Sequence, residues 1–215
     1  MNKKIIGLLW IFTILIVTLG CVNDAKYTPS EAELARQYFN EGFLQYADGN
    51  YSEAIPKFDK VLEIEPNNDE VWYYKGYALK ELGSYYEAIT CFDKVIVLNP
   101  VSEDAWNSKG DALARLGRYI EAHECFDKAI EIYPEFSPAW YNKGNLFFEQ
   151  GRYAEAIKCY DEIIIEEMPA DAEIWQMKGL ALLKLGRAGE AYRCFEKAKE
   201  FYNEQLEYLR NISGN

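Results

Sequence analysis

Residues 103–136 read EDAWNSKGDALARLGRYIEAHECFDKAIEIYPEF, and residues 69–102 read DEVWYYKGYALKELGSYYEAITCFDKVIVLNPVS. Both 34-residue segments carry Trp at the fourth place, Gly at the eighth and fifteenth, Ala at the twentieth and Phe at the twenty-fourth. Segments 35–68, 137–171 and 172–205 follow the same pattern, with Tyr38 in place of the tryptophan, Tyr160 in place of the phenylalanine and one residue inserted near the end of 137–171. Self-similarity at this period predicts helical hairpins stacked into a solenoid.

The shared residue types suit two helices that cross closely. Glycine at the eighth place and alanine at the twentieth lack bulk, and the aromatic residues at the fourth and twenty-fourth fill the space around the crossing. The second glycine, for example Gly83 or Gly117, follows the first helix, where a left-handed residue is expected. Proline ends the second helix of the first four repeats because it removes an internal hydrogen bond, and these prolines are Pro66, Pro100, Pro134 and Pro169.

The order W-x-x-K-G, then A-x-x-x-F, then P resembles the tetratricopeptide repeat family. This resemblance implies an all-α, right-handed superhelical solenoid of five helix-turn-helix repeats. The chain departs from the family where lysine replaces leucine before the first glycine, at Lys75, Lys109, Lys143 and Lys178. The wording K-G-x-A-L…F-D-K also resembles archaeal arrays, which indicates a prokaryotic protein.

The two ends of the repeat domain, residues 30–215, deviate from the pattern. Ser30 followed by Glu33 predicts a capping box that opens the first helix. Lys199 stands where the other repeats carry Leu or Ile, so the fifth repeat is expected to be a terminal cap. Asn203 replaces the proline, and the last helix is therefore expected to run on to about Arg210.

Residues 1–20 form a signal peptide or membrane anchor. Lys3 and Lys4 precede an uncharged apolar run that is typical of a secretory signal. The run ends in Thr18-Leu19-Gly20-Cys21, which resembles a lipoprotein processing site and implies lipidation of Cys21. The alternative is an uncleaved anchor, because residues 5–22 are just long enough to span a bilayer. Both interpretations place the repeats outside the cytoplasm, anchored to the cell membrane through a tether at 21–29.

Charge and chemistry exclude several functions. Without residues 1–20 the chain has 21 basic and 35 acidic residues, a charge of −14, which argues against nucleic-acid binding. The only histidine, His123, replaces an isoleucine of other repeats and is interpreted as a packing residue. No phosphate loop, nucleophile motif or metal-ligand spacing is found, so we expect no enzyme activity, no cofactor and no metal.

Four cysteines occupy the same place in successive repeats. Equivalent positions lie about 10 Å apart, too far for a disulfide and unsuited to zinc. They are therefore interpreted as small, semi-buried packing residues: Cys91, Cys125, Cys159 and Cys194. Two sequons, at Asn50 and Asn211, leave glycosylation open because the chain is expected to face outward.

In the family, the first helices line a concave groove that binds a protein or peptide partner. Transferring the frame predicts these groove residues: Phe39, Phe43, Tyr73, Tyr74, Tyr77, Asn107, Asp111, Tyr141, Asn142, Asn145, Phe148 and Gln176. Tyr46 and Leu180 fall in the same frame. Asp111 and Glu173 would repel a carboxylate, so the family's capture of a C-terminal acidic tail is not expected.

The leading hypothesis is a membrane-anchored extracytoplasmic scaffold that binds a peptide or helix in the groove. One alternative is a self-associating structural envelope protein, a homo-oligomer formed through Phe201, Tyr202, Leu206 and Leu209. Another is an accessory repeat subunit of a larger enzyme complex.

Overall fold

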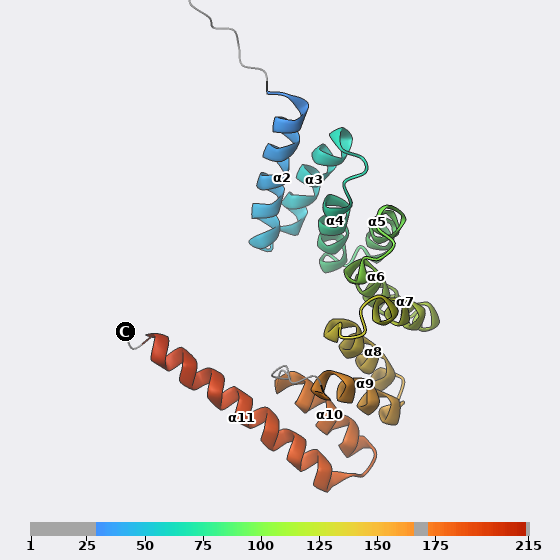
Figure 1. The fold of residues 1–215 in the computed structure, drawn as a ribbon, viewed down its shortest axis with the longest axis vertical. Coiled ribbons are helices and arrows are strands. Elements are labelled where there is room, and N and C mark those ends of the chain that lie inside the picture. Colours follow the sequence, from blue (N-terminus) through green and yellow to red (C-terminus); the bar gives the residue numbers. More distant parts are fainter. Residues whose placement is uncertain (1–28, 166–171, 214–215) are drawn as a thin grey trace, which may run out of the picture.

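The computed structural model describes residues 29–165 and 172–213, with side chains given through residue 163 and over 172–203. These residues form ten α-helices and no strand (Figure 1). The expected signal segment, Cys21, most of the tether and Pro169 lie outside the described residues. The helices are α2 (Glu31–Ala47), α3 (Tyr51–Ile64), α4 (Asp69–Glu81), α5 (Tyr85–Leu98), α6 (Glu103–Arg115), α7 (Tyr119–Ile132), α8 (Ser137–Glu149), α9 (Tyr153–Ile165), α10 (Ala172–Lys184) and α11 (Ala188–Ser213).

The helices pair into five hairpins that stack into a solenoid, as expected. Each first helix contacts the next first helix, from α2 against α4 to α8 against α10. In the described part of the chain, no second helix contacts another second helix. The first helices therefore lie on the inner, tighter side of the curve, where Figure 1 shows α2, α4, α6 and α8 around the opening. The groove predicted from the family frame belongs to this side.

The small residues allow the two helices of a hairpin to touch. The alanine at the twentieth place is fully buried in every repeat. A Cβ atom built on Gly110 would lie 2.7 Å from Cε1 of Phe126, and one on Gly144 would lie 2.6 Å from Cε1 of Tyr160. Because such approaches are closer than van der Waals contact, the aromatic ring requires glycine opposite it. The expected close crossing is confirmed.

The first and second helices end where the sequence predicts. The glycine after each first helix has a φ between 74° and 80°, the left-handed conformation that ends a helix. Helices α3 and α5 end at Ile64 and Leu98, two residues before Pro66 and Pro100.

Trp106 and Trp175 pack against the crossing residues of their own hairpins, as expected, and the tryptophans also reach the joint between repeats. The Trp72 ring is half-buried, and its indole N–H donates to the carbonyl oxygen of Pro66 at 2.9 Å. Nζ of Lys75 lies 5.3 Å from the ring centroid and 2.5 Å from Asp59 of the preceding repeat. The same ion pair recurs with lysines 109, 143 and 178. The lysine that replaces the family's leucine therefore covers the tryptophan and links two repeats.

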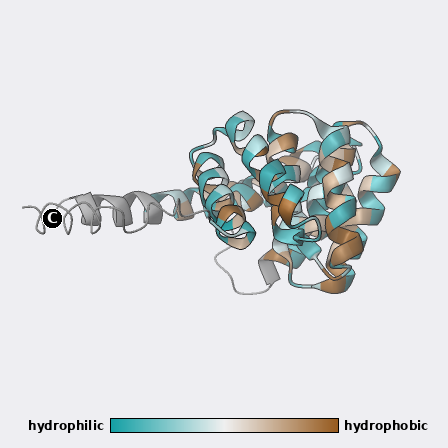
Figure 2. Ribbon diagram, turned by 90° about the horizontal axis from the view of Figure 1, so that it is seen from above, coloured by the Kyte–Doolittle hydropathy of each residue, from teal (hydrophilic) through white to brown (hydrophobic). Residues whose placement is uncertain are grey.

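The two ends of the array match the expected caps. The Glu33 amide donates to Oγ of Ser30 at 3.3 Å, and the Ser30 amide donates to Glu33 at 2.8 Å, completing the capping box. Helix α11 runs to Ser213, three residues beyond the expected Arg210, and Lys199 on it is exposed. Figure 2 shows hydrophobic and hydrophilic residues alternating around the helices of the solenoid, as expected for helices with one buried face.

Candidate protein-binding groove

Five aromatic rings from α2 and α4 form a continuous surface that we call the aromatic patch: Phe39, Phe43, Tyr46, Tyr74 and Tyr77. The Phe43 and Tyr74 centroids lie 5.3 Å apart, edge to face, and Tyr46 lies 5.1 Å from Tyr74 and 5.7 Å from Tyr77. Phe43 stays 40% exposed. Rings held by one another keep an apolar surface open at little conformational cost.

The hydroxyl groups of the patch stay protonated. Burial, followed by the neighbouring tyrosines 77, 73, 51 and 74, raises the pKa of Tyr46. Burial likewise raises the pKa of Tyr74 and Tyr77. A neutral phenol can donate and accept hydrogen bonds, so the patch offers apolar faces together with polar tips.

Tyr73 lies beneath the patch, in the joint between repeats two and three. Its hydroxyl is 3.5 Å from Oγ of the buried Ser108, and burial raises its pKa. Other predicted groove residues form similar bonds between neighbouring first helices. Nδ2 of Asn142 donates to Oδ1 of Asn107 at 2.9 Å, and the Tyr141 hydroxyl donates to Glu173 at 2.6 Å. These side chains hold the repeats together on the groove floor.

A polar pocket of about 100 Å³ lies next along the groove, after the aromatic patch, on α6 to α8. Asp111 enters it, paired with Lys80 at 2.8 Å and with Arg115 at 3.5 Å. Oδ1 of Asn145 accepts a hydrogen bond from the Tyr160 hydroxyl at 2.8 Å. The lining residues come from α6, α7 and α8: Asp111, Ala114, Arg115, Phe126, Asn142, Asn145, Leu146 and Glu149. This pocket brings together three of the predicted groove residues.

The far end of the groove is apolar again. On α10, Leu180 is 37% exposed and Leu183 is 47% exposed, and Gln176 is exposed beside them. Phe148 packs edge to face on Tyr153 at 5.2 Å and is half-buried. Leu183 is not among the predicted groove residues, although it stands at the same frame position as Tyr46.

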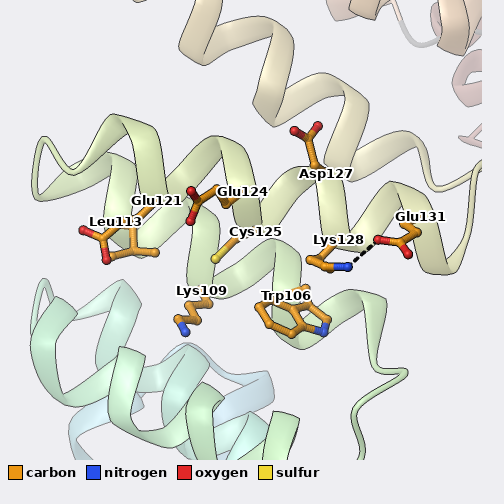
Figure 3. Close-up of a pocket in the computed structure, with 9 residues that line it drawn as sticks. All are labelled: Trp106, Lys109, Leu113, Glu121, Glu124, Cys125, Asp127, Lys128 and Glu131. Carbon is orange, nitrogen blue, oxygen red and sulfur yellow. Dashed lines mark hydrogen bonds and ion pairs between the residues drawn. The ribbon is translucent and has the colours of Figure 1, made fainter.

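A larger hollow of about 440 Å³ lies in repeat three, between α6 and α7 (Figure 3). Trp106, Leu113 and Cys125 form its apolar part, and charged side chains surround them. Lys128 there pairs with Glu131 at 2.5 Å, and Lys109 pairs with Asp93 at 2.6 Å. A similar hollow, of about 380 Å³, lies beside Trp175 and Cys194 in repeat five. We therefore attribute both to the repeat geometry.

The side chains that suggest chemistry serve packing. The four cysteines of the described residues are free and buried, and burial raises the thiol pKa of Cys91, Cys125 and Cys159 to about 11. His123 packs on Phe147, with ring centroids 4.3 Å apart, which confirms its packing role. No three metal-binding side chains converge within the described ranges. None of the described helices combines the length and apolarity needed to cross a bilayer.

Four models of the tetratricopeptide repeat match the chain, over residues 45–111, 103–136, 137–165 and 172–208. A crystal structure of MamA is 28% identical, with a TM-score of 0.69 over 78% of this chain and 97% of that one. MamA from residue 41, of Desulfovibrio magneticus RS-1, is 24% identical with a TM-score of 0.71, over 82% and 99%. A thermophilic repeat protein of Thermus thermophilus, TTC0263, is 21% identical with a TM-score of 0.66, over 83% and 97%. No curated protein matches.

Proposed function

Because the chain belongs to the tetratricopeptide repeat family, we propose that it is a protein-binding scaffold that holds a peptide or helix of a partner in its concave groove. The observation that carries this proposal is the aromatic patch, where Phe43 is 40% exposed although three other rings surround it. Tyr and Phe give a large contact area at low entropic cost, and such side chains dominate protein interfaces. The proposed function is non-enzymatic and uses no cofactor.

The groove has an apolar surface at each end and a polar pocket between them. The aromatic patch lies on α2 and α4, and Leu180 and Leu183 lie on α10. Four helix spacings of about 10 Å separate α2 from α10, a path of about 40 Å. An extended segment of about 12 residues covers that length at about 3.3 Å per residue. A partner bound as an extended peptide is therefore expected to carry apolar residues about 12 positions apart.

The test is crosslinking in the native cells with a groove variant and a matched control. Phe43→Ala with Tyr77→Ala removes two rings of the patch. Tyr86→Ala removes one ring from α5, a second helix, where Tyr86 is 68% exposed. A partner lost with the groove variant and kept with the Tyr86 control supports the proposal. A partner kept by both variants places the interface elsewhere.

We further propose that the scaffold is anchored to the membrane and faces the outside of the cytoplasm. The support is the lysine-flanked apolar segment that ends at Cys21. Cys21→Ser is expected to leave an uncleaved precursor and to abolish the mass increase of a lipidated N-terminus. Mass spectrometry of the purified chain distinguishes the lipidated form from an uncleaved anchor, which the substitution would not change.

Self-association is the second candidate, because the last helix exposes apolar rings. Tyr192 is 64% exposed and Tyr202 is 47% exposed on α11. A sedimentation coefficient that rises with protein concentration would favour this alternative, if Tyr202→Ser abolishes the rise. Concentration-independent sedimentation of a monomer would exclude it.

A further inference from the structure

One apolar position between neighbouring repeats is occupied by a histidine. In repeats two and four the equivalent side chains are Ile89 and Ile157, and each joins a buried cluster with a leucine of the next first helix. In repeat three the residue is His123, which lies against Phe147 of α8. The imidazole therefore occupies a position built for an aliphatic side chain, at the joint between α7 and α8.

Within the described residues the imidazole forms no hydrogen bond of ordinary geometry at this position, and the polar side chain that acts on it is that of Gln150. Both of its nitrogen atoms are buried, and neither forms a hydrogen bond in the described part of the chain. A neutral imidazole tolerates an apolar neighbour better than an imidazolium does, because burial penalises charge more strongly than it penalises a neutral polar group.

Two cations stand at the same joint. The Arg152 guanidinium carbon lies 4.3 Å and Nζ of Lys143 lies 6.0 Å from the Phe147 ring centroid. Lys143 is held by Asp127 at 2.5 Å, and Arg152 is held by Glu155 at 3.0 Å. A proton on His123 would add a third positive charge beside these two.

The charged and polar groups that face His123 come from three elements. Burial lowers the pKa of His123, and Lys143 of α8 and Arg152 before α9 lower it further. Gln150 and Asp127 act in the opposite direction. The neutral form is therefore the one that the folded joint favours.

We propose that the joint between repeats three and four is an acid-sensitive hinge, which loosens when the imidazole of His123 gains a proton against Phe147, Lys143 and Arg152. Among the contacts between a second helix and the following first helix, that of α7 with α8 is the smallest. The polar pocket of the groove is built across the same two repeats, from α6, α7 and α8. Loosening the hinge changes the groove at that pocket, and this consequence rests on the proposed function.

The direction of the pH dependence follows from linkage. A histidine whose pKa is lowered in the closed joint stabilises that joint fully above its ordinary pKa of about 6.5. The stabilisation is lost as the pH falls from there through the lowered pKa, because the open joint binds the proton more readily.

The experiment is hydrogen exchange read by mass spectrometry at pH 7.5 and pH 5, using protection factors corrected for the intrinsic pH dependence of exchange. It needs no partner, so it fails or succeeds independently of the proposed function. We expect protection in α7 and α8 to fall by about threefold or more at pH 5, relative to α4 and α5 of the same molecule. The proposal is overturned if protection in α7 and α8 falls equally in His123→Ile. It is also overturned if protection in the wild-type protein is the same at both pH values.

A transplanted histidine provides the matched gain of function. In Ile89→His the new ring would face Lys109 and Arg118, which hold the frame positions of Lys143 and Arg152. Combined with His123→Ile, this change is expected to move the acid sensitivity to α5 and α6. If no joint of the double variant loses protection at pH 5, the two cations beside the histidine do not explain the acid sensitivity.

Discussion

The ammonium group of Lys80 donates a hydrogen bond to Asp111 across 2.8 Å and lies 4.5 Å from the centroid of the Tyr77 ring. It therefore joins α4 to α6 on the floor of the groove, at the boundary between the aromatic patch and the polar pocket. Both side chains of the pair are mostly covered, with 13% and 24% of their surfaces exposed. Asp111 holds Arg115 as well, at 3.5 Å.

Replacing Lys80 with methionine is expected to destabilise the fold by about 1–2 kcal/mol, because the covered Asp111 loses its closest charged partner. Arg115→Met is the matched control. The Arg115 side chain is 64% exposed, so its loss is expected to cost less than about 0.5 kcal/mol. Urea unfolding of the three proteins measures the difference, and equal costs for the two variants would contradict the assignment of Lys80 as the principal partner.

Replacing Gly110 with alanine is expected to cost about 1–3 kcal/mol, because the new methyl group would overlap the Phe126 ring. Gly189→Ala serves as the control. Gly189 lies in the first turn of α11, and a methyl group added there would meet nothing within 4 Å, so alanine should stabilise by up to about 1 kcal/mol. In thermal denaturation, Tm is expected to fall for Gly110→Ala and to rise for Gly189→Ala. Phe126→Leu should restore part of the stability of Gly110→Ala.

The cysteine ladder is expected to resist alkylation in the folded protein. The pKa of about 11 at Cys91, Cys125 and Cys159 leaves only about one thiol in a thousand ionised at pH 8, burial raises the pKa of Cys194 as well, and the thiolate is the reactive form. In the Cys21→Ser chain, iodoacetamide at pH 8 should label the remaining four cysteines only after urea is added. Mass spectrometry counts the labels. Labelling within minutes in the absence of urea would show that the seats of these thiols open far more often than burial suggests.

Returning Lys109 to the family's leucine is expected to cost about 0.5–1 kcal/mol, because the ion pair with Asp93 and the contact with the Trp106 ring are both lost. Half of the Asp93 side chain is exposed, so the cost should shrink in 1 M salt. Urea unfolding at low and high salt tests this. A cost that does not depend on salt would assign the effect to packing on Trp106 alone.

The floor of the groove is held together by hydrogen bonds between side chains of adjacent repeats. The frame predicts that Tyr73, Asn107 and Asn142 face the groove, and in the structure their hydroxyl and amide groups also form bonds between adjacent repeats. A repeat frame assigns every copy of a position the same direction. It does not show which copy meets a polar neighbour, because that neighbour belongs to another hairpin.

The fold of this protein was determined by its sequence alone, because each hairpin repeats the same local signals. Glycine ends the first helix, proline follows the second, and a glycine and an aromatic ring meet where they cross. The tertiary structure alone decided the rest. It placed Lys75 over the Trp72 ring at the joint between repeats, and it placed His123 beside two cations. Those relations depend on contacts between different repeats, and the spacing along one repeat carries no information about them.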